Sequence, residues 1–209
     1  MSALDLHIHR WIPAKAEGEP TLLLLHGTGG NENDLIQLGE ALRPEAAMLS
    51  PRGNVSEHGA PRFFRRLAEG VFDIDDLHKR TNELADFVAA ASEKYGFALS
   101  SVCAVGYSNG ANIAASMLLS RPEVLNAAAL FRAMVPFEPT NAPRLNDKRV
   151  LISAGRMDQM IPAAGTERLA RILVDAGAQV ELVWQQSSHG LVQGDLVAGE
   201  RFISEFQAR

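Results

Sequence analysis

The chain has 209 residues, of which 46% are hydrophobic and 22% are charged. This length and composition favour one globular domain over residues 1–209 and argue against a disordered chain. Asp and Glu number 25 and Lys and Arg number 20, so the net charge is −5. A general nucleic-acid binder needs a basic surface, and we therefore expect no nucleic-acid partner.

Short apolar runs alternate with longer helical patterns along the chain. Leu4, Leu6 and Ile8 alternate with polar residues, which predicts an edge strand. Continuous apolar runs then predict strands covered on both faces at 22–25, 46–49, 102–105, 127–131, 150–152 and 180–184. Helical patterns follow at 77–95, 111–119, 166–176 and 195–206. This alternation predicts an α/β fold with a mainly parallel sheet.

No segment of the sequence is typical of a secreted or membrane protein. Residues 1–13 contain Asp5, His7, His9 and Arg10 in place of an apolar core. The apolar runs fall far short of the roughly 20 residues that cross a bilayer. The single cysteine, Cys103, excludes an internal disulfide and any site built from several cysteines. We expect a cytoplasmic protein without membrane insertion.

The segment most indicative of chemistry is Gly106-Tyr107-Ser108-Asn109-Gly110, which reads G-x-S-x-G. It lies between a predicted strand and a predicted small-residue helix, the context in which this pattern marks a nucleophilic serine. Glycines on either side of the serine allow a tight turn, and that turn lifts the hydroxyl above the carboxyl end of the strand. The pattern predicts Ser108 as a nucleophile.

A serine nucleophile needs a base, and the base needs a carboxylate that orients it. In this fold the chain order is serine, acid, histidine. His189 is the one histidine after Ser108, so it is the predicted base. Asp158 follows the strand at 150–152 and is the predicted acid, ahead of Glu138. Asp147 precedes that strand and Asp175 ends a helix, so both are less suitable.

The loop His26-Gly27-Thr28-Gly29-Gly30 follows the first buried strand and predicts an oxyanion hole. Its glycines leave backbone amides free to donate. We expect the amides of Thr28 and Asn109 to be the two donors, and His26 to support the loop. The same residues do not fit a phosphate-binding P-loop or a dinucleotide fingerprint, because the required Lys-Ser/Thr and the glycine at position 32 are missing.

Taken together, these motifs resemble the phospholipase/carboxylesterase family of α/β-hydrolases. Ser50-Pro51-Arg52-Gly53 and Arg62-Phe63-Phe64-Arg65 are similar to its compact bacterial branch. The resemblance implies an α/β-hydrolase fold with a mainly parallel sheet of about seven strands and no large cap domain. It also implies a serine esterase with Ser108, Asp158 and His189 as catalytic triad, without cofactor or metal, and makes a homodimer plausible. The thioesterase branch usually has leucine and glutamine where Thr28 and Asn109 stand, which disfavours protein depalmitoylation.

We therefore expect a carboxylesterase that cleaves small esters or thioesters. The alternatives are a lysophospholipase or acyl-protein thioesterase, and a hydrolase-fold receptor for small molecules with little turnover. Residues 51–70, rich in Gly, Pro, Arg and Phe, are expected to form at most a short flap over the site. The candidate pocket residues, for which core packing is the alternative, are Phe63, Phe64, Met134, Val135, Met160 and Leu191.

Overall fold

The computed structural model describes residues 2–141 and 143–206. Across these residues, one sheet of seven strands has the order β1-β3-β2-β8-β9-β10-β11. The first pair, β1 with β3, is antiparallel, and all the remaining neighbouring strands of this sheet are parallel. The strands in this order are β1 (His9–Ile12), β3 (Ala47–Pro51), β2 (Thr21–Leu25), β8 (Val102–Tyr107), β9 (Ala127–Phe131), β10 (Arg149–Gly155) and β11 (Gln179–Gln185).

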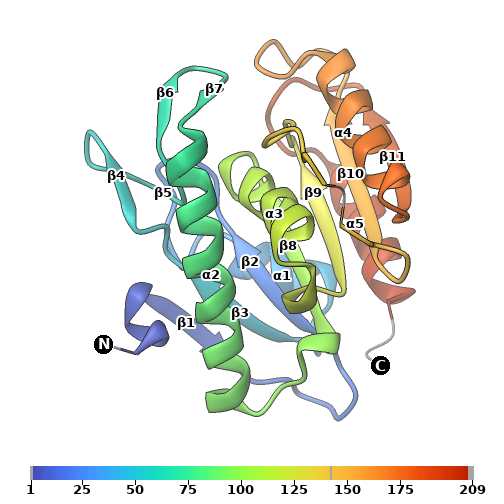
Figure 1. Ribbon diagram of the computed structural model, residues 1–209. Helices are drawn as coiled ribbons and strands as arrows, with labels where there is room; N and C mark the ends of the chain where they lie inside the picture. Colours follow the sequence, from blue (N-terminus) through green and yellow to red (C-terminus); the bar gives the residue numbers. More distant parts are fainter. Residues whose placement is uncertain (1, 142, 207–209) are drawn as a thin grey trace.

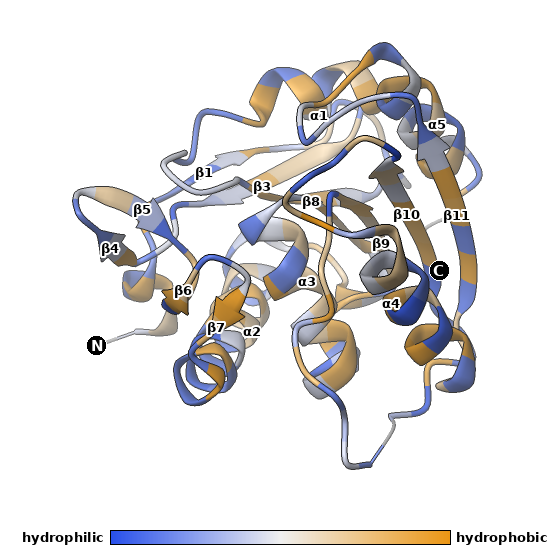
Figure 2. Ribbon diagram, turned by 90° about the horizontal axis from the view of Figure 1, so that it is seen from above, coloured by the Kyte–Doolittle hydropathy of each residue, from blue (hydrophilic) through white to orange (hydrophobic). Residues whose placement is uncertain are grey.

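Helices cover both faces of the sheet (Figures 1 and 2). One face carries α2 (Ile74–Tyr95), α3 (Asn109–Ser120) and α4 (Ala163–Asp175), and the other carries α1 (Ile36–Leu42) and α5 (Gln193–Ser204). Short 3-10 turns occur at Ala3–Leu6, Leu99–Ser101 and Pro122–Val124. The arrangement is an α/β-hydrolase fold, as predicted.

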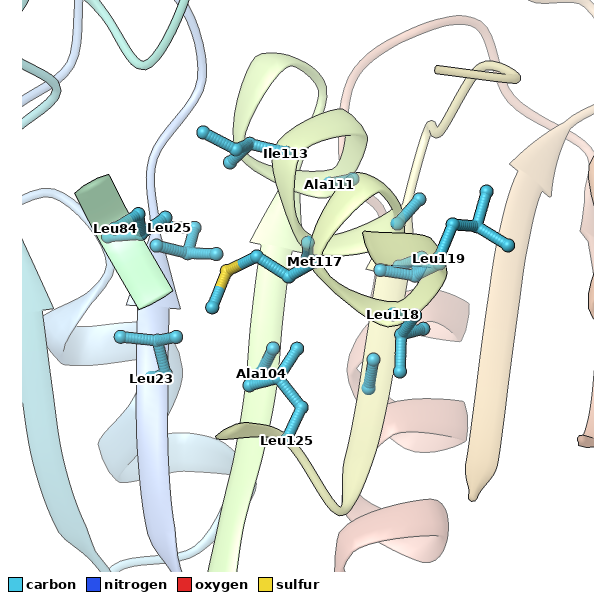
Figure 3. Packing of buried hydrophobic residues seen from close by; sticks show 14 of the residues in the cluster. Leu23, Leu25, Leu84, Ala104, Ala111, Ile113, Met117, Leu118, Leu119 and Leu125 are labelled. Carbon is cyan, nitrogen blue, oxygen red and sulfur yellow. The ribbon is translucent and has the colours of Figure 1, made fainter. Parts of the chain in front are cut away.

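The central strands are buried because the side chains on their two faces pack into two separate hydrophobic cores. Leu23 and Leu25 of β2 belong to the core beneath α2, α3 and α4. Leu22 and Leu24 belong to the core beneath α1 and α5. Figure 3 shows Met117 of α3 reaching from the helix toward Leu25, next to Leu23. The unbroken apolar runs of the sequence follow from this two-sided burial.

The longest helix, α2, begins three residues before the predicted pattern at 77–95 and ends with it at Tyr95. The side chain of Asp73 accepts a hydrogen bond from the amide of Asp76 at the first turn of α2. Gly96 ends the helix with φ 76°, a left-handed conformation that glycine adopts without strain. None of the described helices is long and apolar enough to span a membrane.

The predicted first strand is displaced. Ala3–Leu6 forms a 3-10 turn, and the edge strand is His9–Ile12. Ser2 and Asp5 form a capping box, in which each side chain accepts from the other's backbone N–H. These local hydrogen bonds favour the turn over an extended chain. The short helix α1 was not predicted.

Residues 51–72 contain two small hairpins beside the sheet. One pairs β4 (Val55–Glu57) with β5 (Ala60–Arg62), and the other pairs β6 (Arg66–Ala68) with β7 (Val71–Phe72). Figure 1 shows the second hairpin projecting beyond the start of α2, at the upper end of the molecule in that view. The predicted irregular stretch is therefore ordered as hairpins.

Candidate active site

Ser108 occupies the sharp turn between β8 and α3. Its φ of 52° and ψ of −113° are rare for a residue with a side chain. The surrounding structure holds this strained backbone, because the Ser108 amide donates to the Phe131 carbonyl at 2.9 Å and the Ser108 carbonyl accepts from the Asn112 amide at 3.0 Å. The strain places the hydroxyl at the carboxyl edge of the sheet.

The turn requires glycine on both sides of the serine. A Cβ added to Gly106 would lie 2.7 Å from the Cα of Ala111, and one added to Gly110 would overlap the backbone carbonyl of Leu25. The helix can approach the sheet this closely only because these positions lack side chains. The steric explanation of the G-x-S-x-G motif is confirmed.

Ser108, His189 and Asp158 come together at this edge. His189 Nε2 lies 2.9 Å from Ser108 Oγ, and His189 Nδ1 lies 2.8 Å from Asp158 Oδ2. A carboxylate can only accept, so Nδ1 carries the proton and Nε2 is free to accept from the serine hydroxyl. This is the geometry that base activation of a serine requires.

Asp158 is held on the loop between β10 and α4. Its Oδ1 accepts from the amides of Met160 at 2.9 Å and Ile161 at 3.2 Å, which leaves Oδ2 for His189. Its side chain is 2% exposed. The alternative acid Glu138 instead pairs with Arg168 at the surface, 2.5 Å away.

Arg132 anchors the loop that carries His189. It directly follows β9 with φ 59°, and its side chain is fully buried. The guanidinium donates to the carbonyls of Ser188 at 3.2 Å and Gly190 at 2.8 Å. It also donates to Ser187 Oγ at 2.9 Å. Because these residues flank His189, the contacts restrict the position of the imidazole.

Asp195 balances the buried charge of Arg132. Its two oxygens each accept from the guanidinium at 2.8 Å. They also accept from Ser153 Oγ at 2.7 Å and from the Val192 amide at 2.8 Å. A buried ion pair is stable only when its remaining hydrogen-bonding capacity is met, and here four hydrogen bonds surround the carboxylate.

The predicted oxyanion donors lie beside the nucleophile. Thr28 and Asn109 line the same cavity as Ser108 and His189. Their backbone N–H groups form no hydrogen bond with any other residue in the ranges 2–141 and 143–206. For Asn109 this is expected, because the first amides of a helix have no partner within it. Both amides are therefore free to donate.

His26 supports the glycine loop, as interpreted from the sequence. The Gly53 amide donates to its Nε2 at 2.9 Å, so Nδ1 carries the proton and donates to the Gly27 carbonyl at 2.6 Å. Burial lowers the pKa of His26, which keeps the ring neutral near pH 7.

Tyr107 also contacts the loop that carries His189. Its hydroxyl donates to the His189 carbonyl at 3.2 Å, and the two ring centroids lie 5.6 Å apart. Burial raises the pKa of Tyr107, so the phenol keeps its proton as a donor.

The site opens into a small cavity of about 50 Å³ that is connected to solvent. Met134 and Met160, two of the predicted pocket residues, line it. The β6–β7 hairpin contributes Arg66, Glu69 and Phe72 to the lining. This hairpin stands where the flap was expected.

The pocket prediction is wrong for four residues. Phe63 and Phe64 are 1% and 0% exposed and belong to the core, where Phe63 packs against the His26 ring and Phe64 against the Phe72 ring. Val135 packs against the same core. Leu191 is 38% exposed and lines a different hollow between α1 and α5. Burial of apolar area decides the positions of Phe63 and Phe64, whereas Leu191 faces a different part of the surface.

Sequence reasoning missed Arg132, Asp195 and the cavity residue Asn112. A charged residue directly after a buried strand, as Arg132 stands after Phe131, is the signal that could have identified the first. The other two give no such signal, because their partners come from distant segments.

Comparison with known proteins assigns the chain to a family. The model of the dienelactone hydrolase family matches residues 61–195. The chain belongs to this family. MhqD of Bacillus subtilis (strain 168), which is named as a supposed hydrolase, is 46% identical over 91% of this chain and 96% of its own. The protein is therefore a member of a hydrolase family.

Two solved structures closely match the dienelactone hydrolase family member described here. The carboxylesterase of Bacillus cereus is 44% identical, with a TM-score of 0.93 over 95% of this chain and 94% of its own. A carboxylesterase of Mesorhizobium loti is 28% identical, with a TM-score of 0.90 over 96% of this chain and 95% of its own. The expected relation to a compact carboxylesterase branch of the α/β-hydrolases is confirmed.

Proposed function

We propose that the protein is a serine carboxylesterase that hydrolyses small carboxylic esters through an acyl-enzyme on Ser108. The observation that carries this proposal is the pair of hydrogen bonds joining Ser108 to His189 and His189 to Asp158. The resemblance to two carboxylesterases supports an ester as substrate.

Acylation begins when His189 Nε2 takes the proton of Ser108 and the serine oxygen bonds to the ester carbonyl carbon. Asp158 holds the ring and stabilises its positive charge. The amides of Thr28 and Asn109 donate to the oxyanion, each contributing on the order of 3 kcal/mol to transition-state stabilisation. His189 then gives the proton to the leaving alcohol as the C–O bond breaks.

Deacylation repeats these steps with water. His189 takes a proton from water, the hydroxide oxygen bonds to the acyl carbon, and Ser108 leaves with the proton that His189 returns. In both half-reactions the imidazole must be neutral at the moment it accepts the proton.

The test is hydrolysis of 4-nitrophenyl acetate by Ser108→Ala, with Ser120→Ala as control. Ser120 is an exposed serine at the other end of α3. We expect Ser108→Ala to lose turnover by a factor on the order of 10⁴ or more, and Ser120→Ala to match the unaltered enzyme. Substantial turnover by folded Ser108→Ala would reject the nucleophile. A chain-length series would show rates that fall with longer acyl groups, whereas a lysophospholipase would show the reverse.

A further inference from the structure

The cavity beside Ser108 has a wall of hydrogen-bond donors that the reaction at the serine does not use. Arg62, Arg66 and Asn112 line it together with Ser108. Glu69, at the exposed end of the β6–β7 hairpin, is the acidic side chain of the lining. Phe72, Met134, Met160 and Ile161 line the same cavity, so apolar side chains and a few hydrogen-bond donors share its wall, as is usual where polar groups fix the orientation of a ligand.

Asn112 is the most informative of these donors. It lies one helical turn after Ser108 on α3, so the two residues share a face of the helix. It is 5% exposed. Its Oδ1 accepts from the Met134 amide at 2.7 Å. A backbone N–H can only donate, so this contact fixes which end of the side-chain amide is oxygen.

The Nδ2 group of Asn112 consequently carries two N–H bonds with no acceptor among the residues that the structure describes. This nitrogen is not fully buried and reaches the solvent-accessible lining of the cavity, so a substrate oxygen can take the place of water there. A donor left unpaired in the lining of a cavity is paired when a ligand supplies the acceptor.

The arginines add positive charge to the same wall. The Arg62 side chain is 4% exposed and donates to Thr28 Oγ1 at 2.5 Å. The single carboxylate of Glu57 pairs with Arg62 at 3.2 Å and with Arg66 at 2.9 Å. Two guanidinium groups therefore share the Glu57 carboxylate, and their N–H groups favour an electron-rich oxygen in the cavity.

We propose that Asn112 binds an oxygen atom of the substrate, and that the enzyme prefers esters with a hydroxyl or carboxylate oxygen near the reacting bond over plain alkyl esters. The proposal rests on the serine esterase function above and names its substrate class. Asn112 is a substrate-binding residue here, and it takes no part in the proton transfers.

The test compares 4-nitrophenyl butanoate, 3-hydroxybutanoate and the succinate half-ester, which differ in one terminal or side group. A second series compares the acetates of 1-butanol and 1,3-butanediol. If the acyl series shows no preference, a preference in this second series would show that the bound oxygen belongs to the alcohol part of the ester. The measured quantity is the ratio of kcat/KM between the oxygen-bearing and the plain ester for each variant, which cancels effects on the triad.

Asn112→Asp is the decisive variant, because an aspartate oxygen still accepts from the Met134 amide while the donor is lost. Asn141→Asp, at an exposed position, is the control for the added charge. Asn112→Leu removes both donor and acceptor and serves as the second variant.

We expect the ratio to favour an oxygen-bearing ester by about tenfold in the unaltered enzyme and in Asn141→Asp, and to fall to near one in both Asn112 variants. The succinate half-ester should be the poorest substrate of Asn112→Asp, since like charges then meet. A ratio near one in both series, or a ratio that both Asn112 variants leave unchanged, would overturn the proposal. Ester hydrolysis that does not need Ser108 would instead reject the proposed function itself.

Discussion

Variants of the buried ion pair between Arg132 and Asp195 allow its effect on the free energy of unfolding to be measured apart from its effect on kcat. Replacing Asp195 by leucine leaves the Arg132 guanidinium buried and unbalanced, with four hydrogen bonds to the carboxylate lost. Breaking a buried pair in this way costs about 3–5 kcal/mol. With a urea dependence of about 2–3 kcal/mol per molar for a chain of this size, the urea concentration at the unfolding midpoint should fall by about 1–2.5 M.

The double variant Arg132→Met/Asp195→Leu removes both charges. Its loss of stability should be smaller than the sum of the two single losses, because no unpaired charge remains. Its kcat should nevertheless be about 100-fold below that of the unaltered enzyme. The loop around His189 has lost the hydrogen bonds that Arg132 donates to Ser188 and Gly190. A displacement of the catalytic base by about 1 Å can reduce the rate by this factor.

Urea unfolding and steady-state hydrolysis of 4-nitrophenyl acetate provide both measurements on the same samples. We expect kcat to change more than KM, because the substrate contacts are intact while the base is displaced. A double variant with unaltered kcat would refute the reasoning and leave Arg132 a purely structural residue.

Other predictions follow from single contacts. Asp158→Asn should lower kcat by about 10⁴-fold with folding intact by circular dichroism, because the imidazole loses the carboxylate that sets its tautomer. Gly110→Ala should lower the urea midpoint because its Cβ overlaps the Leu25 carbonyl, whereas Gly165→Ala, with open space around its Cβ, should raise stability by about 0.5–1 kcal/mol. Burial lowers the pKa of His26, so the unfolded state binds more protons below about pH 6.5. Stability should therefore fall as the pH drops from 7 to 5, by at most about 1.4 kcal/mol per pH unit from this group, and His26→Gln should flatten the slope.

Much of the fold could be predicted from the sequence because the strands that form it are buried on both faces. Leu22 to Leu25 and Ala127 to Phe131 are apolar at every position, and the helices on the two faces of the sheet bury each of them. The helix α1 escaped prediction because it is seven residues long, contains Gly39 and begins without a side-chain cap. Short elements of this kind depend on tertiary packing.

The three residues proposed as the triad could be named from the G-x-S-x-G motif, the chain order and the predicted strand ends, because topology brings the ends of parallel strands to one edge. The pocket could not be named in the same way. Phe63 lies in the core because burying an aromatic ring stabilises the fold, and nothing in the local sequence distinguishes that position from a cavity wall. The donor Asn112 depends on its contact with Met134, which only the folded chain brings close.

The central claim is that Ser108 becomes a nucleophile. Peptide mapping by mass spectrometry, after reaction with a fluorophosphonate that labels activated serines, tests it most directly. We predict one phosphonate per chain, located on Ser108, with loss of ester hydrolysis in proportion to labelling. A label on another residue, or ester hydrolysis that persists after Ser108 is fully modified, would contradict the account.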